Sequence, residues 1–483
     1  MSHGSWPRTT PFLRRKSLAA ADPAVAPAGG HGLKRSLGVW RLALIGVSST
    51  IGTGIFFIFS VATPLAGPAV VLAFLVAGLA AALSALCYAE LASAAPTAGS
   101  AYTAAYAALG EGLAFVLAAC LLLEYGVATA AIAVTWAQYL NEFGRITLGT
   151  SLPHALSAAP SEGGLINLPA VALVALVTAL LVRGVRESAT ANAIMVAIKV
   201  GVLAVFVLAG AAGFNAANLH PFMPNGFSGV GAAASLIFFA FIGIDSIATA
   251  GEEAINPRRT LPLAILLAFL IVTVVYLSVA IVAVGAQPAE AFRGAGGNLA
   301  AILAAVTGAR WPTALISAGA VVSIFSIALV LVYSQTRVLF AVSRDGLLPA
   351  PFSRVNPRTG APVTNTVTVA AIAAVMSGFL PLGVLAEMVS VGTLGAFILV
   401  AVSVIVLRLT QPPSPQQFRL PLFPVIPLAS IGLCLYLLTG LAGVTLWMFA
   451  GWLAASVAVY LLYGAKRSRL AQAPCGSGAA DAG

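Results

Sequence analysis

Three ionisable side chains lie deep within long apolar stretches of the sequence: Glu124, Lys199 and Asp245. Residues of this kind are costly inside a bilayer and usually face a cavity, a partner or an ion path. Lys199 is the most informative, because a buried lysine that takes up and releases a proton can couple proton movement to a conformational change. Its ammonium would stand where a sodium-coupled carrier holds a cation. The alternative is a permanent structural pair with Glu124 or Asp245.

A small, polar stretch at residues 48–54 interrupts the first long apolar segment. It reads Ser-Ser-Thr-Ile-Gly-Thr-Gly, so three hydroxyl residues precede two glycines. If the helix unwinds here, free N–H groups at the start of the following half-helix can bind a carboxylate. The alternative is close helix packing at small residues.

A second interruption occurs in the sixth apolar stretch, at residues 238–246. Gly243 lies mid-stretch, aromatic residues precede it and Asp245 follows it. Two broken helices together predict a binding site near the membrane midplane. Phe239 or Phe241 is then a candidate gate over a substrate, and the alternative is ordinary packing against lipid or the protein core.

The composition indicates where these residues lie. Of the 483 residues, 60% are hydrophobic and 8% are charged, and the mean hydropathy is +1.02. Soluble domains carry about 25% charged residues, so the sequence excludes a soluble enzyme, a secreted domain and a nucleic-acid-binding module. Backbone groups cannot stay unpaired in hydrocarbon, so the apolar stretches should be helices. Twelve stretches are long enough to span: 38–62, 66–92, 113–140, 167–183, 190–213, 228–250, 261–286, 313–341, 364–381, 384–408, 422–443 and 445–464.

The basic residues predict the orientation of these spans. Most of the 24 Lys and Arg residues fall on the side of the N-terminus, and the other side has only Arg145, Arg293 and Arg310. Cytoplasmic loops carry the excess of Lys and Arg, so both termini should be cytoplasmic in a multi-pass protein of the cell (plasma) membrane. Residues 1–36 then form a basic, disordered tail, and residues 465–483 form a second cytoplasmic tail.

Two further segments are rich in small residues but do not resemble spans: residues 93–112, before the third span, and residues 297–310, before the eighth. Their five-span offset indicates two halves that are inverted relative to each other, because five is odd. We expect a transporter core over residues 37–409, with repeats at about 37–213 and 227–409, followed by helices eleven and twelve over 410–464. Inverted repeats with broken helices are typical of transporters.

A series of motifs runs in order through residues 31–464. They are HGLKRSLG, IGTGIF, YAELASAAPTAGSAY, LLLEYGVA, FFAFIGIDSIATAGEEAINPRRTLPLAI, SRDGLLP, NPRTGAPV and FRLPLFPVIP. In this order and spacing they resemble the amino acid–polyamine–organocation superfamily, close to its bacterial branch similar to cationic amino acid transporters. The resemblance implies an all-α membrane protein with twelve transmembrane helices, a LeuT-like fold of five plus five inverted helices, broken helices one and six, and two appended helices.

The resemblance also implies site residues. The substrate carboxylate would meet the unwound first helix, the ammonium would meet carbonyls of both broken helices, and Phe239 would be the gate. Lys199 matches a lysine that stands in for a sodium ion, and Glu124 matches an acidic residue of the third span in close relatives. The implied substrate-binding residues are Thr50, Ile51, Gly52, Thr53, Gly54, Phe239, Ala240 and Ile242. We expect Lys199 and Glu124 to act in proton coupling, together with Asp245, which is the third ionisable residue within a span.

These observations favour a secondary transporter that carries an amino acid with a proton by alternating access. The pocket-facing part of span eight, residues 327–333, is apolar and has no tryptophan to stack on a guanidinium. We therefore expect neutral L-amino acids rather than arginine or lysine. The alternatives are an exchanger or a cationic amino acid carrier on the same scaffold, and a channel or amino-acid sensor.

An enzyme is not expected, because no span contains a histidine that would complete a catalytic or metal-binding set. We expect no metal, organic cofactor or nucleic acid partner. Glu90, Glu252 and Glu253 lie near span ends, where gating contacts and simple solvation are equally compatible with the sequence.

Overall fold

A computed structural model of the chain describes residues 11–16, 37–95, 100–184, 189–293, 298–356, 361–410 and 417–472. These residues form helices joined by loops, with two isolated bridges, Leu37 to Ala254 and Ser157 to Asn167. The longer helices are α1 (Val39–Thr50), α2 (Thr53–Phe57), α3 (Phe59–Ala66), α4 (Val70–Ala94), α5 (Ser100–Leu109), α6 (Glu111–Thr147), α8 (Leu168–Val182), α9 (Ala189–Ala211), α10 (Gly226–Ile237), α12 (Pro257–Ala286), α13 (Leu299–Thr307), α14 (Arg310–Arg344), α15 (Val363–Phe379), α16 (Leu382–Thr410), α17 (Val425–Thr439) and α18 (Gly443–Val459). The shorter elements used below are η1 (Pro11–Leu13), α7 (His154–Ser157), η6 (Phe238–Phe241), α11 (Ser246–Thr249), η7 (Gly251–Glu253), η11 (Tyr460–Gly464), α19 (Ala465–Arg467) and α20 (Arg469–Gln472).

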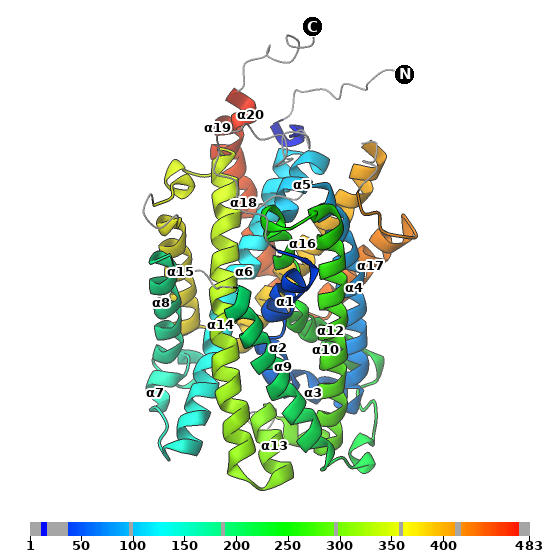
Figure 1. Cartoon of the computed structure of the whole chain (residues 1–483), viewed down its shortest axis with the longest axis vertical. Coiled ribbons are helices and arrows are strands. Elements are labelled where there is room, and N and C mark those ends of the chain that lie inside the picture. The colour runs from blue at the N-terminus through cyan, green and yellow to red at the C-terminus, as the bar shows by residue number, and fades with distance from the viewer. Residues whose placement is uncertain are drawn as a thin grey trace.

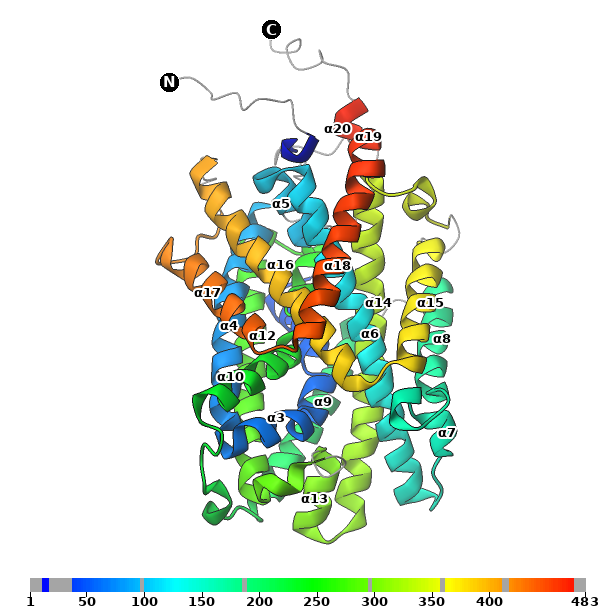
Figure 2. The same cartoon turned by 180° about the vertical axis from the view of Figure 1, so that it is seen from behind.

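The long helices stand side by side in one bundle (Figures 1 and 2). The first and last described elements, η1 and α20, lie at the same end of this bundle, which we call the terminal end. The loops around α7 and α13 lie at the opposite end.

An all-helical membrane protein is the fold that the sequence predicts. Within the described ranges, nine helical stretches are long and apolar enough to cross a membrane, and α8, α15 and α17 are shorter apolar helices. Together they cover the regions where apolar stretches were expected. The count of twelve spans and the inverted repeat stay predictions.

The centre of the bundle is built on α6, which packs along α14 and α16. On the other side of the centre, α12 packs along α4 and α1. The ends of α1 and α2 lie between these groups in the middle of the bundle (Figure 1). The first and sixth apolar stretches are therefore interrupted where the surrounding helices bury them.

The two small-residue segments that were not expected to span form short helices. Residues 93–112 contain α5 and residues 297–310 contain α13. They lie at opposite ends of the bundle, α5 at the terminal end (Figures 1 and 2).

Residues 11–16 depart from the disordered tail that we predicted for 1–36. They include η1 and pack against α6 and η11, because Phe12 stacks on Tyr460 and Arg14 reaches Glu111. The other residues of that tail, 1–10 and 17–36, lie outside the described part of the chain. Of the predicted C-terminal tail, residues 465–472 form α19 and α20, and residues 473–483 lie outside the described part.

Candidate functional site

Both helix breaks that the sequence predicts are present. α1 ends at Thr50, and Ile51 and Gly52 leave helical geometry before α2 begins at Thr53. In the sixth stretch, α10 tightens into η6, Ile242 is extended, and α11 begins only at Ser246.

The two breaks contact each other so closely that glycine is required at both. A Cβ at Gly54 would lie 2.5 Å from the Cα of Ala240. Gly243 has φ +103°, and a Cβ there would lie 2.6 Å from the Ser49 carbonyl oxygen. The Ser49 hydroxyl donates to the Gly243 carbonyl at 2.8 Å. The glycines therefore permit backbone-to-backbone contact between the broken helices.

Tyr276 on α12 contacts both breaks, and its role was not predicted from the sequence. Its hydroxyl lies 2.7 Å from the Thr50 carbonyl oxygen and 2.8 Å from that of Ala240, and the residue is fully buried. A buried tyrosine hydroxyl normally finds a partner, so a lone tyrosine in an apolar span was the available signal. The Thr50 carbonyl, an expected ammonium contact, already accepts this bond.

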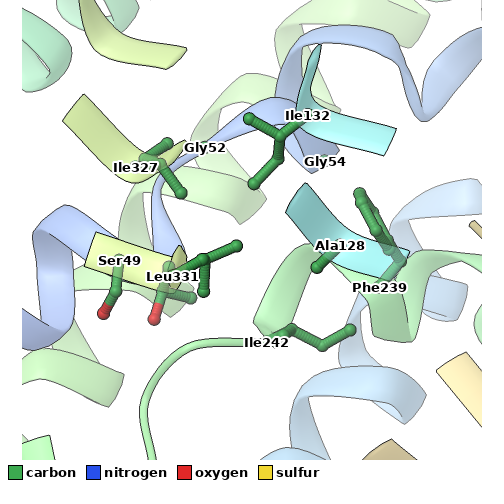
Figure 3. Close-up of a pocket in the computed structure, with 10 residues that line it drawn as sticks. Ser49, Gly52, Gly54, Ala128, Ile132, Phe239, Ile242, Ile327 and Leu331 are labelled. Atoms are coloured by element: carbon green, nitrogen blue, oxygen red, sulfur yellow. The ribbon is translucent and has the colours of Figure 1, made fainter. Parts of the chain in front are cut away.

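A small cavity lies where the breaks meet (Figure 3). Thr50, Gly52, Gly54, Phe239 and Ile242, all expected to bind substrate or to gate it, line this cavity. The remaining lining residues are Ser49 from α1, Ala128 and Ile132 from α6, and Ile327 and Leu331 from α14.

Other predicted site residues lie beside the cavity without lining it. Ile51 is fully buried, and Ala240 contributes the carbonyl that Tyr276 reaches. The ring of Phe241 packs on Tyr276, 5.3 Å between centroids, and Phe241 is not among the residues that line the cavity. Of the two gate candidates, Phe239 is therefore the one at the cavity. α2 begins with Thr53, whose side chain lies outside the described part of the structure.

The chemistry of the lining divides into a polar backbone part and an apolar wall. The polar part is the break itself, where the first N–H groups of a helix have no partner within it. The Thr50 hydroxyl is buried there and has no hydrogen-bond partner in the described part. The wall consists of Ala128, Ile132, Ile327, Leu331 and Phe239, and none of the ten lining residues carries a charge.

The fit between the walls is tight. A Cβ at Gly52 would lie 2.5 Å from Cδ1 of Ile327. Phe239 and Phe57 stack edge to face at 5.7 Å between centroids. The walls of the cavity therefore lie close together.

Lys199 lies on α9 and is fully buried beside α1. Its ammonium donates to the Ser48 carbonyl at 2.7 Å and reaches the Ser48 hydroxyl at 3.2 Å. The sequence predicts a bridge from this lysine to carbonyls of the first span and to hydroxyls of span eight, such as those of Ser323 or Ser326. The contact with the first span is present, whereas the Ser323 hydroxyl is buried without a hydrogen-bond partner in the described part. The contact joins a charged group to the helix turn that directly precedes the break.

Glu124 and Asp245 lie in a second buried polar cluster, and neither lines the cavity. Tyr125 donates to one carboxylate oxygen of Asp245, and the other oxygen has no hydrogen-bond partner in the described part. Both carboxylate oxygens of Glu124 and the Tyr88 hydroxyl are also buried without such a partner there. Buried carboxyl groups in this state either bind a proton or meet a cation. Tyr125 was not singled out from the sequence, although it follows Glu124 directly.

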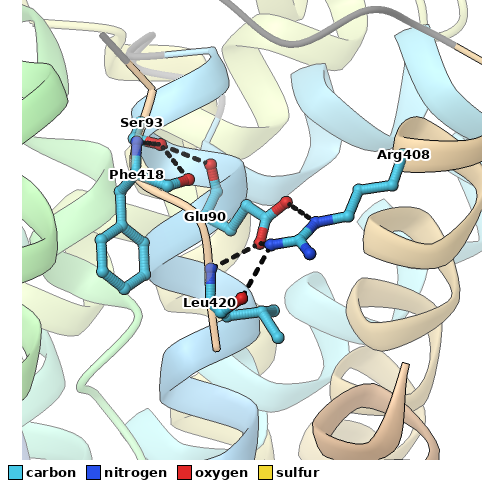
Figure 4. Close-up of polar contacts among 5 residues, drawn as sticks. All are labelled: Glu90, Ser93, Arg408, Phe418 and Leu420. Atoms are coloured by element: carbon cyan, nitrogen blue, oxygen red, sulfur yellow. Dashed lines mark hydrogen bonds and ion pairs between the residues drawn. The ribbon is translucent and has the colours of Figure 1, made fainter. Parts of the chain in front are cut away.

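Two of the acidic residues near span ends form ion pairs at the terminal end. Glu90, 1% exposed, makes a two-pronged pair with Arg408 at 2.6 Å, and it also accepts from the backbone of Leu420 (Figure 4). Glu253 meets Arg337 at 3.3 Å, which joins η7 to α14. The side chain of Glu252 lies outside the described part.

Comparison with known proteins decides the family. The sequence pattern of the family described as amino acid permease matches residues 37–464. The chain belongs to the amino acid permease family. This family, within the amino acid–polyamine–organocation superfamily, consists of transporters rather than enzymes.

Three relatives show the range of this permease family. The branched-chain amino acid permease BcaP of Bacillus subtilis (strain 168) is 42% identical over 95% of this permease and 99% of the relative. The methylthioribose transporter of the same organism is 40% identical with the same coverage. The vacuolar cationic amino acid transporter 2 of Arabidopsis thaliana is 39% identical over 86% of this permease and 67% of the relative.

Proposed function

We propose that this permease carries neutral amino acids with aliphatic side chains across the cell membrane by proton-coupled alternating access. The observation that carries the proposal is the cavity between the two helix breaks, which combines backbone polar groups with an uncharged, apolar wall.

The backbone polar groups and the apolar wall of the cavity would bind different parts of the substrate. The carboxylate meets backbone N–H groups at Gly52–Gly54, and the ammonium meets break carbonyls such as those of Phe239 and Ile242. The aliphatic side chain lies against Ile132, Ile327 and their neighbours. A relative with 42% identity is named for branched-chain amino acids, which agrees with such a wall.

Coupling to protons rests on Lys199. When its ammonium is charged, its bond to the Ser48 carbonyl holds α9 against the first broken helix. Loss of the proton removes this charge-assisted bond and lets α1 move away from α9. Each change of one unit in the pKa of a group between two states is worth about 1.4 kcal/mol, so proton binding can bias the conformational equilibrium.

We also propose how the helices of the permease are oriented in the membrane. The terminal end faces the cytoplasm, because the excess of Lys and Arg falls on that side of the chain. The described helices fit twelve spans, with repeats at about 37–213 and 227–409. The placement of α5 and α13 at opposite ends supports an inverted relation between the repeats.

The cationic carrier is the second candidate. Glu124 and Asp245 are buried, and both oxygens of Glu124 and one of Asp245 have no hydrogen-bond partner in the described part of the chain, so these groups could receive a basic side chain. Several relatives are named cationic amino acid transporters. We favour the neutral substrate because neither carboxylate residue lines the cavity.

The test is uptake into proteoliposomes that contain the purified permease, measured with and without an inward proton gradient and with and without an internal amino acid. The labelled compounds are leucine, isoleucine, valine, alanine, arginine, lysine and methylthioribose. We expect uptake of the aliphatic amino acids, driven by an inward proton gradient and independent of sodium. Arginine uptake that is lost on Glu124→Gln or Asp245→Asn would instead establish the cationic carrier. Accumulation that needs an opposing amino acid and ignores the proton gradient would establish an exchanger.

A further inference from the structure

The terminal end of the bundle carries a built docking site that the transport cycle described above does not use. Its occupant is the chain's own segment Pro11–Lys16, with the sequence Pro-Phe-Leu-Arg-Arg-Lys. Along this segment buried and exposed side chains alternate. Phe12, Arg14 and Lys16 are partly buried, whereas Leu13 and Arg15 are exposed. Each of the three partly buried residues has its own receptor group.

The aromatic anchor is Phe12. Its ring meets the ring of Tyr460 in an edge-to-face contact at 5.5 Å between centroids. It also covers Gly112, where a Cβ would overlap the ring. The Tyr460 hydroxyl lies 2.9 Å from the carbonyl oxygen of Pro11, so η11 holds both the backbone and the ring of the segment.

The first basic anchor, Arg14, faces Glu111 at the start of α6. Glu111 is fully buried, and its carboxylate accepts hydrogen bonds from Tyr106 at 2.8 Å and Ser468 at 2.6 Å. The Arg14 guanidinium lies 3.8 Å from this carboxylate and donates to the Ala465 carbonyl at 2.9 Å. The Glu111 backbone N–H donates to the Arg14 carbonyl at 2.8 Å. A buried carboxylate in this position needs a cation, and the docked segment supplies one.

The second basic anchor, Lys16, repeats this arrangement at the end of α14. Its ammonium pairs with Asp345 at 2.9 Å, and the other oxygen of Asp345 accepts from the Tyr102 hydroxyl at 3.0 Å. Burial, with the adjacent carboxylates of Asp345 and Glu111, raises the pKa of Tyr102 and of Tyr106. Both hydroxyls therefore remain donors at neutral pH.

The docked segment acts on α5 through these shared carboxylates. Tyr102 and Tyr106 are both on α5, and each shares its carboxylate with one cation of the segment. α5 in turn contacts α4 and α11, next to the broken sixth stretch, as well as α6 and α16. α5 therefore connects the docked segment to the broken sixth stretch.

We propose that residues 11–16 are a clasp built into the chain. When it is docked, it fixes α5 and keeps the terminal end closed, and its release allows substrate to exchange at that end. The effect of the clasp on substrate exchange rests on the proposed transport function. The docking itself is measured without transport.

The direct test of docking is a disulfide between Phe12→Cys and Gly112→Cys in a full-length Cys475→Ser background. A Cβ at Gly112 would touch the ring carbon bonded to the Phe12 Cβ, which places the pair near the usual Cβ separation of about 3.8 Å. We expect the disulfide to form with mild oxidant, whereas Arg15→Cys with Gly112→Cys should not form it. Failure of the first pair to cross-link in a folded, monodisperse protein would overturn the docking.

The consequence is tested by counterflow before and after reduction of the same cross-linked sample. We expect loss of counterflow in the oxidised sample and recovery after dithiothreitol. Phe12→Ala, Arg14→Glu and Lys16→Glu should raise the counterflow rate, whereas their exposed neighbours Leu13→Ala and Arg15→Glu should leave it unchanged. Equal rates in the oxidised and reduced samples, or equal effects of Arg14→Glu and Arg15→Glu, would overturn the clasp. Absence of transport in the parent protein would instead contradict the proposed function and leave the cross-link result standing.

Discussion

Replacing Tyr276 by phenylalanine removes a hydroxyl on α12 that lies within hydrogen-bond distance of both helix breaks. This hydroxyl lies 2.7 Å from the Thr50 carbonyl oxygen and 2.8 Å from that of Ala240. The hydroxyl has a single proton and donates to one of the two carbonyls at a time. Tyr276→Phe removes this donor from both buried carbonyls. The shape of the ring and its packing are kept.

The magnitude of the effect follows from the burial of these carbonyls. An unsatisfied buried acceptor costs about 1–3 kcal/mol. This energy changes the equilibrium between joined and separated breaks by roughly 5- to 150-fold. If only the joined state binds an amino acid, the apparent Kd rises by up to that factor.

The assay is equilibrium binding of labelled leucine to the purified permease in detergent. Tyr139→Phe is the matched control, because this buried tyrosine donates to the Phe56 carbonyl at 2.8 Å and does not bridge the breaks. Both variants should unfold at similarly lowered temperatures, but only Tyr276→Phe should weaken binding. Leucine binding by Tyr276→Phe that matches the parent would refute the bridging role.

Three further variants test other contacts. Lys199→Ala should abolish accumulation driven by a pH gradient while leucine exchange persists, and undiminished pH-driven uptake would contradict the coupling role of the bond to Ser48. Gly54→Ala should abolish leucine binding because its Cβ would lie 2.5 Å from Ala240, whereas Gly432→Ala, with open space around it, should bind like the parent. Glu90→Gln breaks a buried ion pair, a change that typically costs about 3–5 kcal/mol, so it should lower the melting temperature. Arg145→Gln breaks an exposed pair worth about 0–1 kcal/mol, so it should leave the melting temperature unchanged.

The parts of the site that the sequence predicted are those set by local composition. Glycines with neighbouring hydroxyls indicated where the first helix breaks, and Gly243 among aromatic residues indicated the second break. A lysine in an apolar helix must find an oxygen, and Ser48 supplies it. The apolar character of residues 327–333 indicated a wall at Ile327.

What the sequence did not predict depends on contacts between distant segments. Tyr276 lies on a helix that carries neither break, so its role emerges only when both breaks converge on it. Phe241 and Phe239 are equivalent in the sequence, and the tight turn of η6 directs one ring toward Tyr276 and the other toward the cavity. The composition of residues 1–36 indicated disorder. The contacts that order residues 11–16 could not be predicted from that composition, because the groups that bind them lie near positions 110, 345 and 460.

An experimental structure of the permease with bound leucine would show directly whether the amino acid binds between the two helix breaks. We expect the carboxylate at the backbone of Gly52–Gly54 and the isobutyl group against Ile132 and Ile327. The leucine ammonium should lie within hydrogen-bond distance of carbonyls of the second break. Leucine located elsewhere, or a carboxylate turned away from the break toward Lys199, would contradict the proposed binding site.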